Sequence, residues 1–233
     1  MPDVVRFPPQ VAAFDAMGFA MVAGVCAPAG CDAWSACVPA KAASAGTRSL
    51  LGEAWCAEAA RRLRTHEVLA RLLGPEDVAV QCTYFEKSAS RNWLVPMHQD
   101  LSIPVAERVP DARLAGWSHK EGAWFVHAPA VLLARLTAVR VHLDACTEAD
   151  GPLRVVPGSH RLGLMTEEAV NAARRRTAEV VCTGSKGSAL VMRPLLLHAS
   201  SRSSDHSRSR RRVLHFLFGP PALPHGLRWQ HAV

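Results

Sequence analysis

Apolar residues near the start of the chain recur at helical spacing. Val11, Phe14 and Met17 lie three residues apart, which is typical of one face of a helix. Gly18 is expected to end this helix, because glycine tolerates the backbone conformation that terminates helices. The uncharged run over residues 19–25 that follows predicts a short strand.

Two further segments of the first third are also predicted to be helical. One covers residues 29–38. The other covers residues 52–73, which are rich in Ala, Leu, Arg and Glu and are followed by the helix-ending pair Gly74-Pro75. The pattern therefore predicts a helical scaffold over about residues 1–75.

After Gly74 the pattern changes to short β-branched and aromatic runs bounded by Gly, Pro, Ser and Asp, which is the signature of strands. The predicted strands cover residues 78–86, 138–143, 153–156, 179–182, 189–192 and 212–218. The predicted fold is mainly β with flanking helices, and its β core, a sandwich or barrel, covers about residues 76–220.

The stretch over residues 105–136 interrupts the predicted β core. It contains Pro110, Gly116, Gly122 and Pro129, so we interpret it as a long insertion with a short helix over residues 130–136. Insertions of this length often act as lids over a binding site. We expect this one to be lid-like.

Composition is that of an ordinary globular protein. The chain has 233 residues, of which 49% are hydrophobic and 20% charged, and no break in composition divides it, so we expect residues 1–233 to form a single domain. No secretory signal or membrane-spanning run is recognisable. The seven cysteines are scattered without a CxxC pair, which favours a reducing cytoplasm.

The formal net charge of +7 comes mainly from arginine clusters near residues 174–176 and 202–212. Such clusters could bind nucleic acid. No aromatic stacking pattern accompanies them, so we interpret them as a solvated helix end and a loop, and we do not expect nucleic acid as a partner. The sequence leaves the oligomeric state open.

Two HxD triplets are candidate metal ligands: His98-Gln99-Asp100 and His142-Leu143-Asp144. In an extended segment residues i and i+2 point to the same side, so both side chains of a triplet can reach one metal. Two imidazoles and one carboxylate leave open positions on iron, and His198, after an apolar run where a strand would end, could complete the set. Spacing alone does not choose between the triplets.

Three blocks in order resemble the phytanoyl-CoA dioxygenase family. Residues 95–101 (VPMHQDL) are similar to its segment of a proline, one or two residues and HQD, and residues 150–160 (DGPLRVVPGSH) to its NGxLxxxPGSH turn. Residues 187–200 (GSALVMRPLLLHAS) resemble its glycine-led strand pair that ends in the distal histidine. The resemblance covers about residues 78–218.

The resemblance implies a double-stranded β-helix, a jelly-roll or cupin-like core, that binds Fe(II) and uses 2-oxoglutarate and O2. His98, Asp100 and His198 match the family's iron ligands. Related halogenases have a small residue where Asp100 stands, so the carboxylate implies hydroxylation of an unactivated C–H bond, with release of succinate and CO2.

Other functions stay open beside hydroxylation of a small molecule or acyl derivative. The same site could serve desaturation, cyclisation or epimerisation. From a different class, the chain could be a non-catalytic module that binds nucleic acid or another polyanion.

The resemblance also implies residues that hold 2-oxoglutarate. An arginine suits its distal carboxylate, since a guanidinium grips a carboxylate with two parallel hydrogen bonds. Arg211 is our choice, with Arg210 and Arg212 as rivals, and Lys87 stands where the family often has a lysine. By strand alternation Gln81 and Thr83 share a face with Lys87 and could line the same site.

Three residues are candidates for contacting the substrate. Arg140 could neutralise an anionic substrate, although a local carboxylate is the more common partner of a partly buried arginine. Arg154 is open to the same two interpretations, and Trp93 could close over an apolar substrate.

Overall fold

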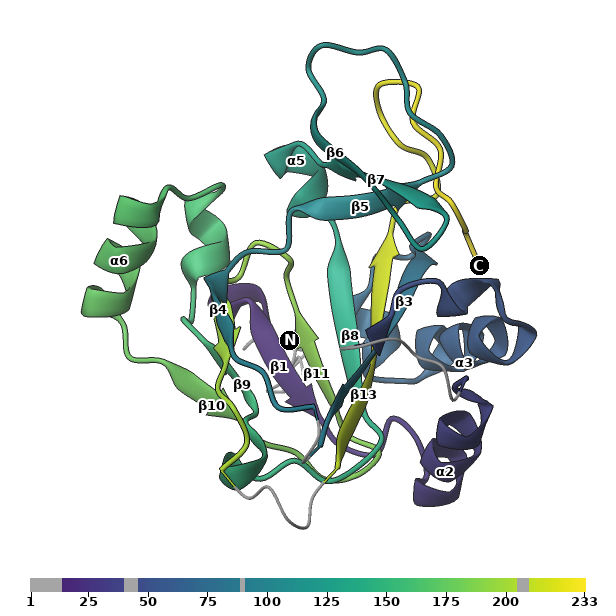
Figure 1. Cartoon of the computed structure of the whole chain (residues 1–233), viewed down its shortest axis with the longest axis vertical. Coiled ribbons are helices and arrows are strands. Elements are labelled where there is room, and N and C mark those ends of the chain that lie inside the picture. The colour runs from purple at the N-terminus through teal and green to yellow at the C-terminus, as the bar shows by residue number, and fades with distance from the viewer. Residues whose placement is uncertain (1–13, 40–45, 89–90, 205–209) are drawn as a thin grey trace, which may run out of the picture.

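The computed structural model describes residues 14–39, 46–88, 91–204 and 210–233. Two antiparallel sheets face each other across a cavity, with helices outside them (Figure 1). In the described part the larger sheet has the spatial order β1 (Phe19–Val22), β11 (Ala189–Met192), β8 (Thr137–His142), β13 (Arg211–Gly219), β3 (Val78–Lys87) and β2 (Gly46–Thr47). The smaller sheet has the order β10 (Val180–Cys182), β9 (Leu153–Val155), β12 (His198–Ser200) and β4 (Val95–His98).

The chain passes back and forth between the two sheets. It runs from β3 in the larger sheet to β4 in the smaller one, returns to β8, crosses to β9 and β10, returns to β11, and then passes through β12 to β13. This alternation is the topology of a double-stranded β-helix, so the predicted fold class is confirmed. The six predicted strands all form, each within one or two residues of its predicted ends.

Alternating residues of β13 separate the core from the cavity. Leu214, Phe216 and Phe218 are buried in the apolar cluster that contains the helices, whereas Arg211 and His215 line the cavity. Side chains of successive strand residues point to opposite faces, so one strand supplies both surfaces. The apolar positions of β13 thus pack in the core, and its polar positions line the cavity.

Helices cover the outer face of the larger sheet (Figure 1). They are α2 (Pro28–Cys37), the 3-10 turn η1 (Leu50–Gly52), α3 (Ala54–Thr65) and α4 (Leu69–Leu72). The predicted helix over residues 52–73 is therefore two helices, because His66 is extended, with φ −67° and ψ 130°, and ends α3. Of the first predicted helix, residues 14–17 are helical, and Val11 lies outside the described residues.

The stretch over residues 105–136 is not the loop with one helix that the sequence predicts. It contains β6 (Ala115–Lys120) and β7 (Ala123–His127), which form a separate sheet with β5 (Ser102–Val105), and then α5 (Ala130–Leu133). The turn from β6 to β7 has φ 51° at Glu121 and 79° at Gly122, as tight hairpin turns require. A glycine that indicated a loop instead closes a hairpin.

Hydrogen bonds connect the tip of the β6–β7 hairpin to the edge of the larger sheet, beside the cavity. Glu121 accepts hydrogen bonds from the Thr47 hydroxyl at 2.8 Å and from the Arg48 guanidinium at 3.0 Å. Arg48 and Lys120 both line the cavity. The three-stranded sheet is thus one wall of the cavity, and a lid-like motion of this segment stays a prediction.

The remaining elements are η2 (Glu148–Asp150), η3 (Ser159–Leu162) and α6 (Glu167–Arg176), whose last turn carries an arginine cluster. Several of the clustered arginines are paired: Arg174 with Glu179 at 3.0 Å, Arg210 with Glu86 at 3.2 Å and Arg212 with Asp144 at 2.7 Å. In the described part of the chain, no helix has the length and apolar character needed to cross a membrane.

Candidate active site

The two candidate histidines lie opposite each other in the smaller sheet. His98 ends β4 and is the antiparallel partner of His198, whose ring centroid lies 4.2 Å from its own. His198 begins β12, so the prediction that it follows a strand end is wrong. The reason is that residues 194–197 form a turn and the strand starts after it.

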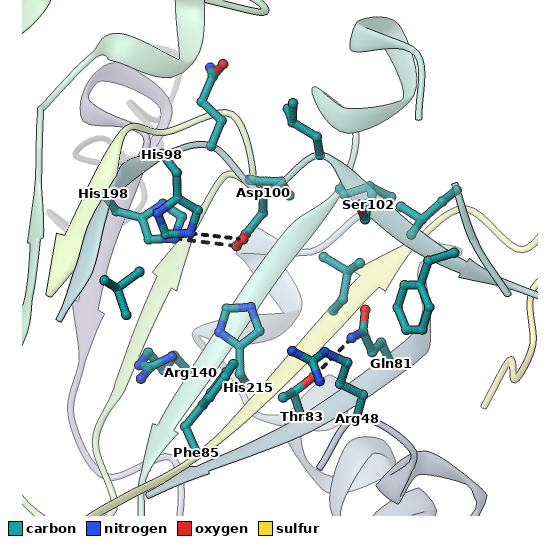
Figure 2. A pocket seen from close by; sticks show the side chains of 18 of the residues that line it. Arg48, Gln81, Thr83, Phe85, His98, Asp100, Ser102, Arg140, His198 and His215 are labelled. Atoms are coloured by element: carbon teal, nitrogen blue, oxygen red, sulfur yellow. Dashed lines mark hydrogen bonds and ion pairs between the residues drawn. The ribbon is translucent and has the colours of Figure 1, made fainter. Parts of the chain in front are cut away.

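Asp100 completes a three-sided group with the two imidazoles (Figure 2). Its backbone N–H donates to the Pro194 carbonyl at 2.9 Å, which holds the residue beside β12. One carboxylate oxygen lies 3.6 Å from His98 Nε2, and the other lies 3.6 Å from His198 Nε2. One potential ligand atom from each residue lies within 4.8 Å of the others.

Backbone carbonyls set the tautomers of both histidines. His98 Nδ1 lies 2.8 Å from the Pro96 carbonyl, and His198 Nδ1 lies 2.9 Å from the Leu196 carbonyl. A carbonyl can only accept, so each Nδ1 carries the proton and each Nε2 keeps its lone pair. Both lone pairs are free beside the Asp100 carboxylate. The donor set therefore fits a divalent iron with open positions.

Gln99 joins the segments that carry the three ligands. Its side-chain amide donates to the Leu195 carbonyl at 2.7 Å and to the Gly163 carbonyl at 2.8 Å, and it accepts from the Met165 N–H at 3.0 Å. The Leu195 contact lies three residues before His198. The middle residue of the triplet thus fixes the spacing between the two halves of the site, a role that the sequence analysis missed.

Asp100 is ionised in this arrangement. Burial raises the pKa of its carboxyl, but the facing His198 and His98 imidazoles outweigh burial and hold the pKa well below its usual range. Burial lowers the pKa of His198, whereas for His98 the facing Asp100 carboxylate outweighs burial and raises the pKa. A carboxylate and neutral imidazoles are the forms that bind a metal.

The rival triplet does not form a metal site. Asp144 binds the Arg212 guanidinium at 2.7 and 2.8 Å, and His142 Nδ1 lies 3.2 Å from the Ser188 hydroxyl. Burial lowers the pKa of His142 to about 4. Both side chains are used inside the fold, which favours His98 and Asp100 as the candidate ligands.

A cavity of about 460 Å³ lies between the sheets and is bordered by the three candidate ligands. Residues of neighbouring strands that lie side by side in the larger sheet show which residues are close together on the cavity side. Arg211 lies beside Lys87, Val213 lies between Phe85 and His142, and His215 lies between Thr83 and Arg140. The apolar part is lined by Leu101, Ile103, Phe125, Leu133, Leu136, Leu153 and Leu217. The cavity therefore has a cationic end and an apolar end.

The structure brings Arg211 into the cavity and leaves its rivals outside. Arg211 is 4% exposed, and its buried Nε has no hydrogen-bond partner in the described part of the chain. Burial lowers its pKa, although the neighbouring Cys146 opposes this. Arg210 and Arg212 instead pair with Glu86 and Asp144. A buried guanidinium without a carboxylate is suited to an anionic ligand.

Lys87 lies behind the cavity wall and not in it. It is 1% exposed and donates to the Ser200 hydroxyl at 2.5 Å and to the Ser201 carbonyl, and the cavity is lined by Ser200. Burial, with the charges of Arg211 and Arg140, lowers the pKa of Lys87 to about 7. Since the Ser200 oxygen accepts from Lys87, its own O–H is free to donate into the cavity.

The other predicted residues divide between the cavity and the surface. Gln81, Thr83 and Trp93 line the cavity, and the Gln81 amide donates to the Thr83 hydroxyl at 3.0 Å. Arg154 is not among the lining residues: it pairs with Glu179 at 3.1 Å. The prediction of a substrate contact for Arg154 is therefore not supported, because β9 directs alternate side chains away from the cavity.

His215 is a cavity residue that the sequence analysis missed. Its ring lies beneath Asp100 in Figure 2, and its buried Nδ1 has no hydrogen-bond partner among the described residues. Burial lowers its pKa to about 4, so the ring is neutral at neutral pH. The sequence could have predicted this position, because His215 is four residues after Arg211 and strand alternation places both on one face.

Two imidazoles and one carboxylate, held inside a double-stranded β-helix, define the class of non-haem iron oxygenases. The family model of phytanoyl-CoA dioxygenase matches residues 14–211, and the chain belongs to this family. It is thus an enzyme that binds Fe(II) and uses 2-oxoglutarate and O2. No curated protein matches the sequence.

Several solved structures have the same fold. AviO1 from Streptomyces viridochromogenes is 22% identical with a TM-score of 0.61, covering 92% of this chain and 95% of its own. EctD from S. alaskensis, solved with 2-oxoglutarate and 5-hydroxyectoine, is 19% identical with a TM-score of 0.66, covering 94% and 78%. HygX from Streptomyces hygroscopicus, solved with nickel and 2-oxoglutarate, is 15% identical with a TM-score of 0.60, covering 98% and 96%.

Proposed function

We propose that the protein hydroxylates an unactivated C–H bond of a small, largely apolar molecule or acyl derivative. The observation that carries this proposal is the Asp100 carboxylate, which completes the ligand set beside an apolar cavity. A small residue at this position would leave a place for a halide on the metal, whereas the carboxylate fills it. The apolar end of the cavity suits a substrate of the same character.

In this proposal His98, Asp100 and His198 hold the iron. Bound Fe(II), with 2-oxoglutarate and O2, supplies the oxidising power and releases succinate and CO2. The chain contributes fixed ligands, since backbone carbonyls orient both imidazoles and Gln99 holds the two segments together. The apolar residues exclude water from the cavity and position the substrate C–H bond.

The distal carboxylate of 2-oxoglutarate is assigned to Arg211 and Ser200. The buried guanidinium can donate two parallel hydrogen bonds, and the free O–H of Ser200 can donate a third. Lys87 acts behind them as a positioning residue, because it holds the Ser200 oxygen. Gln81, Thr83 and Trp93 line other parts of the same cavity.

The pH dependence of cosubstrate binding should report on Lys87. Its pKa of about 7 lies below the usual lysine value, so in the free protein the amine loses its proton as pH rises above 7. A bound carboxylate favours the protonated amine. We therefore expect the affinity for 2-oxoglutarate to fall roughly 3- to 10-fold between pH 7 and pH 9, equivalent to about 0.7–1.4 kcal/mol.

Anaerobic titration of the iron-loaded protein with 2-oxoglutarate at several pH values measures this effect. Lys87→Met should bind more weakly at pH 7 and show a flatter profile. Lys186→Met is a matched control, because Lys186 pairs with Asp32 on the surface. A steep profile that persists in Lys87→Met would show that another group controls binding.

Two measurements test the proposed function itself. Iron(II) and 2-oxoglutarate added anaerobically should give the weak visible charge-transfer band of the chelate in the wild type and not in His98→Ala. A metabolite library should then be screened for compounds that stimulate succinate release. Products formed under 18O-labelled O2 should carry one labelled hydroxyl group, and an unlabelled product would identify desaturation, cyclisation or epimerisation instead.

A further inference from the structure

A second arginine in the cavity lacks an anionic partner. Arg140 lies on β8 in the middle of the larger sheet, is 6% exposed, and has no ion pair with any carboxylate in the described part of the chain. The expectation that a local carboxylate neutralises it is therefore wrong. Its guanidinium lies over the Phe85 ring, 5.2 Å from the centroid. Burying such a charge costs free energy unless a ligand compensates it.

Arg140 lies nearer to the iron ligands than Arg211 does. In the strand register Arg140 lies beside His215, whose ring lies beneath Asp100 (Figure 2). Arg211 lies four residues before His215 on β13, beside Lys87. After burial, the charge of Arg140 is among the causes that lower the pKa of His198 and His215. The charges of both arginines act on the pKa of Lys87 and Cys146.

The cavity thus has a candidate metal site and two buried cations, in the order iron ligands, Arg140, Arg211. A 2-oxo acid that chelates a metal uses one oxygen of its C1 carboxylate and its keto oxygen, so the second C1 oxygen stays available. The C5 carboxylate lies at the far end of the molecule. Two cations at different distances from the metal match these two carboxylates.

We propose that Arg140 binds the free C1 carboxylate oxygen of 2-oxoglutarate, while Arg211 binds the C5 carboxylate. This inference rests on the proposed function, because it assigns a residue toward the same cosubstrate. Phe85 holds the Arg140 guanidinium in place by a cation–π contact. Arg140 then fixes the orientation of the chelate on the iron and is a cosubstrate residue, in place of the substrate contact that the sequence suggested.

Two ligands that differ only at C5 separate the roles of the two arginines. 2-Oxopentanoate is 2-oxoglutarate with a methyl group in place of the C5 carboxylate. The dissociation constants of both ligands are measured anaerobically on the iron(II)-loaded full chain, from the charge-transfer band. The proteins compared are the wild type, Arg140→Gln, Arg140→Lys and Arg211→Gln, with Arg175→Gln on the exposed side of α6 as a control.

Arg140→Gln should weaken the binding of both ligands by about tenfold and leave their ratio unchanged, and Arg140→Lys should recover part of each affinity. Arg211→Gln should weaken 2-oxoglutarate binding and leave 2-oxopentanoate unaffected. The melting temperature of ligand-free Arg140→Gln should not fall, because the variant removes a buried charge without a carboxylate partner.

Several results would overturn the assignment. If Arg140→Gln weakens only 2-oxoglutarate binding, both arginines hold the C5 carboxylate. If it weakens neither, or lowers the melting temperature by several degrees, Arg140 has a substrate-binding or structural role. Failure of 2-oxopentanoate to bind the wild type at tens of millimolar would also contradict it. A wild type without any 2-oxoglutarate band would instead refute the proposed function.

Discussion

Replacing Asp100 by alanine should remove hydroxylation and weaken Fe(II) binding by at least about 100-fold. Loss of a group that merely orients a metal ligand already costs 10- to 100-fold in affinity, and Asp100 is itself the one carboxylate of the site in the described chain. Its removal also leaves the two imidazoles without the charge that favours a divalent cation. Metal affinity by competition with a chelator and succinate release both measure the effect.

The second HxD triplet provides the matched control. Asp144→Asn changes the same chemical group in the same motif, but Asp144 binds Arg212 and lies away from the metal ligands. This variant should lose some stability and keep its Fe(II) affinity within about twofold. If Asp100→Ala retains the chelate band and succinate formation, the ligand assignment is wrong.

Replacing Arg211 by glutamine should raise the apparent KM for 2-oxoglutarate by one to two orders of magnitude. A hydrogen bond to a charged group contributes about 1.5–3 kcal/mol, and the buried guanidinium can donate two of them. Glutamine keeps a polar side chain of similar length without the charge. Succinate formation over a range of cosubstrate concentrations gives the KM.

The neighbouring arginines test the register of this strand. Arg210→Gln and Arg212→Gln each remove one charge within one residue of Arg211, but both side chains are already paired with carboxylates outside the cavity. Neither variant should raise the KM for 2-oxoglutarate more than about threefold. A large rise in either one, with none in Arg211→Gln, would show that the assigned cosubstrate arginine is wrong.

The elements of the β core could be predicted from sequence because their signals are local. Alternating apolar residues and turn residues placed six strands, and the ordered motifs indicated His98, Asp100 and His198. Local sequence patterns gave a wrong prediction where pairing with another strand determines the secondary structure. The hairpin of β6 and β7 forms where glycine and proline suggested a loop, because its two strands pair with each other and β7 also pairs with β5.

By itself, then, the sequence determined the fold class and indicated the candidate ligands in their order along the chain. Only the tertiary structure decided between chemically identical candidates. Asp144 and Arg212, 68 residues apart, neutralise each other, which leaves Asp100 and Arg211 as the candidates for binding a metal and an anion. It also showed that Arg140 has no such partner in the described chain. Ion pairs form between residues that are distant in sequence, so local sequence patterns cannot predict them.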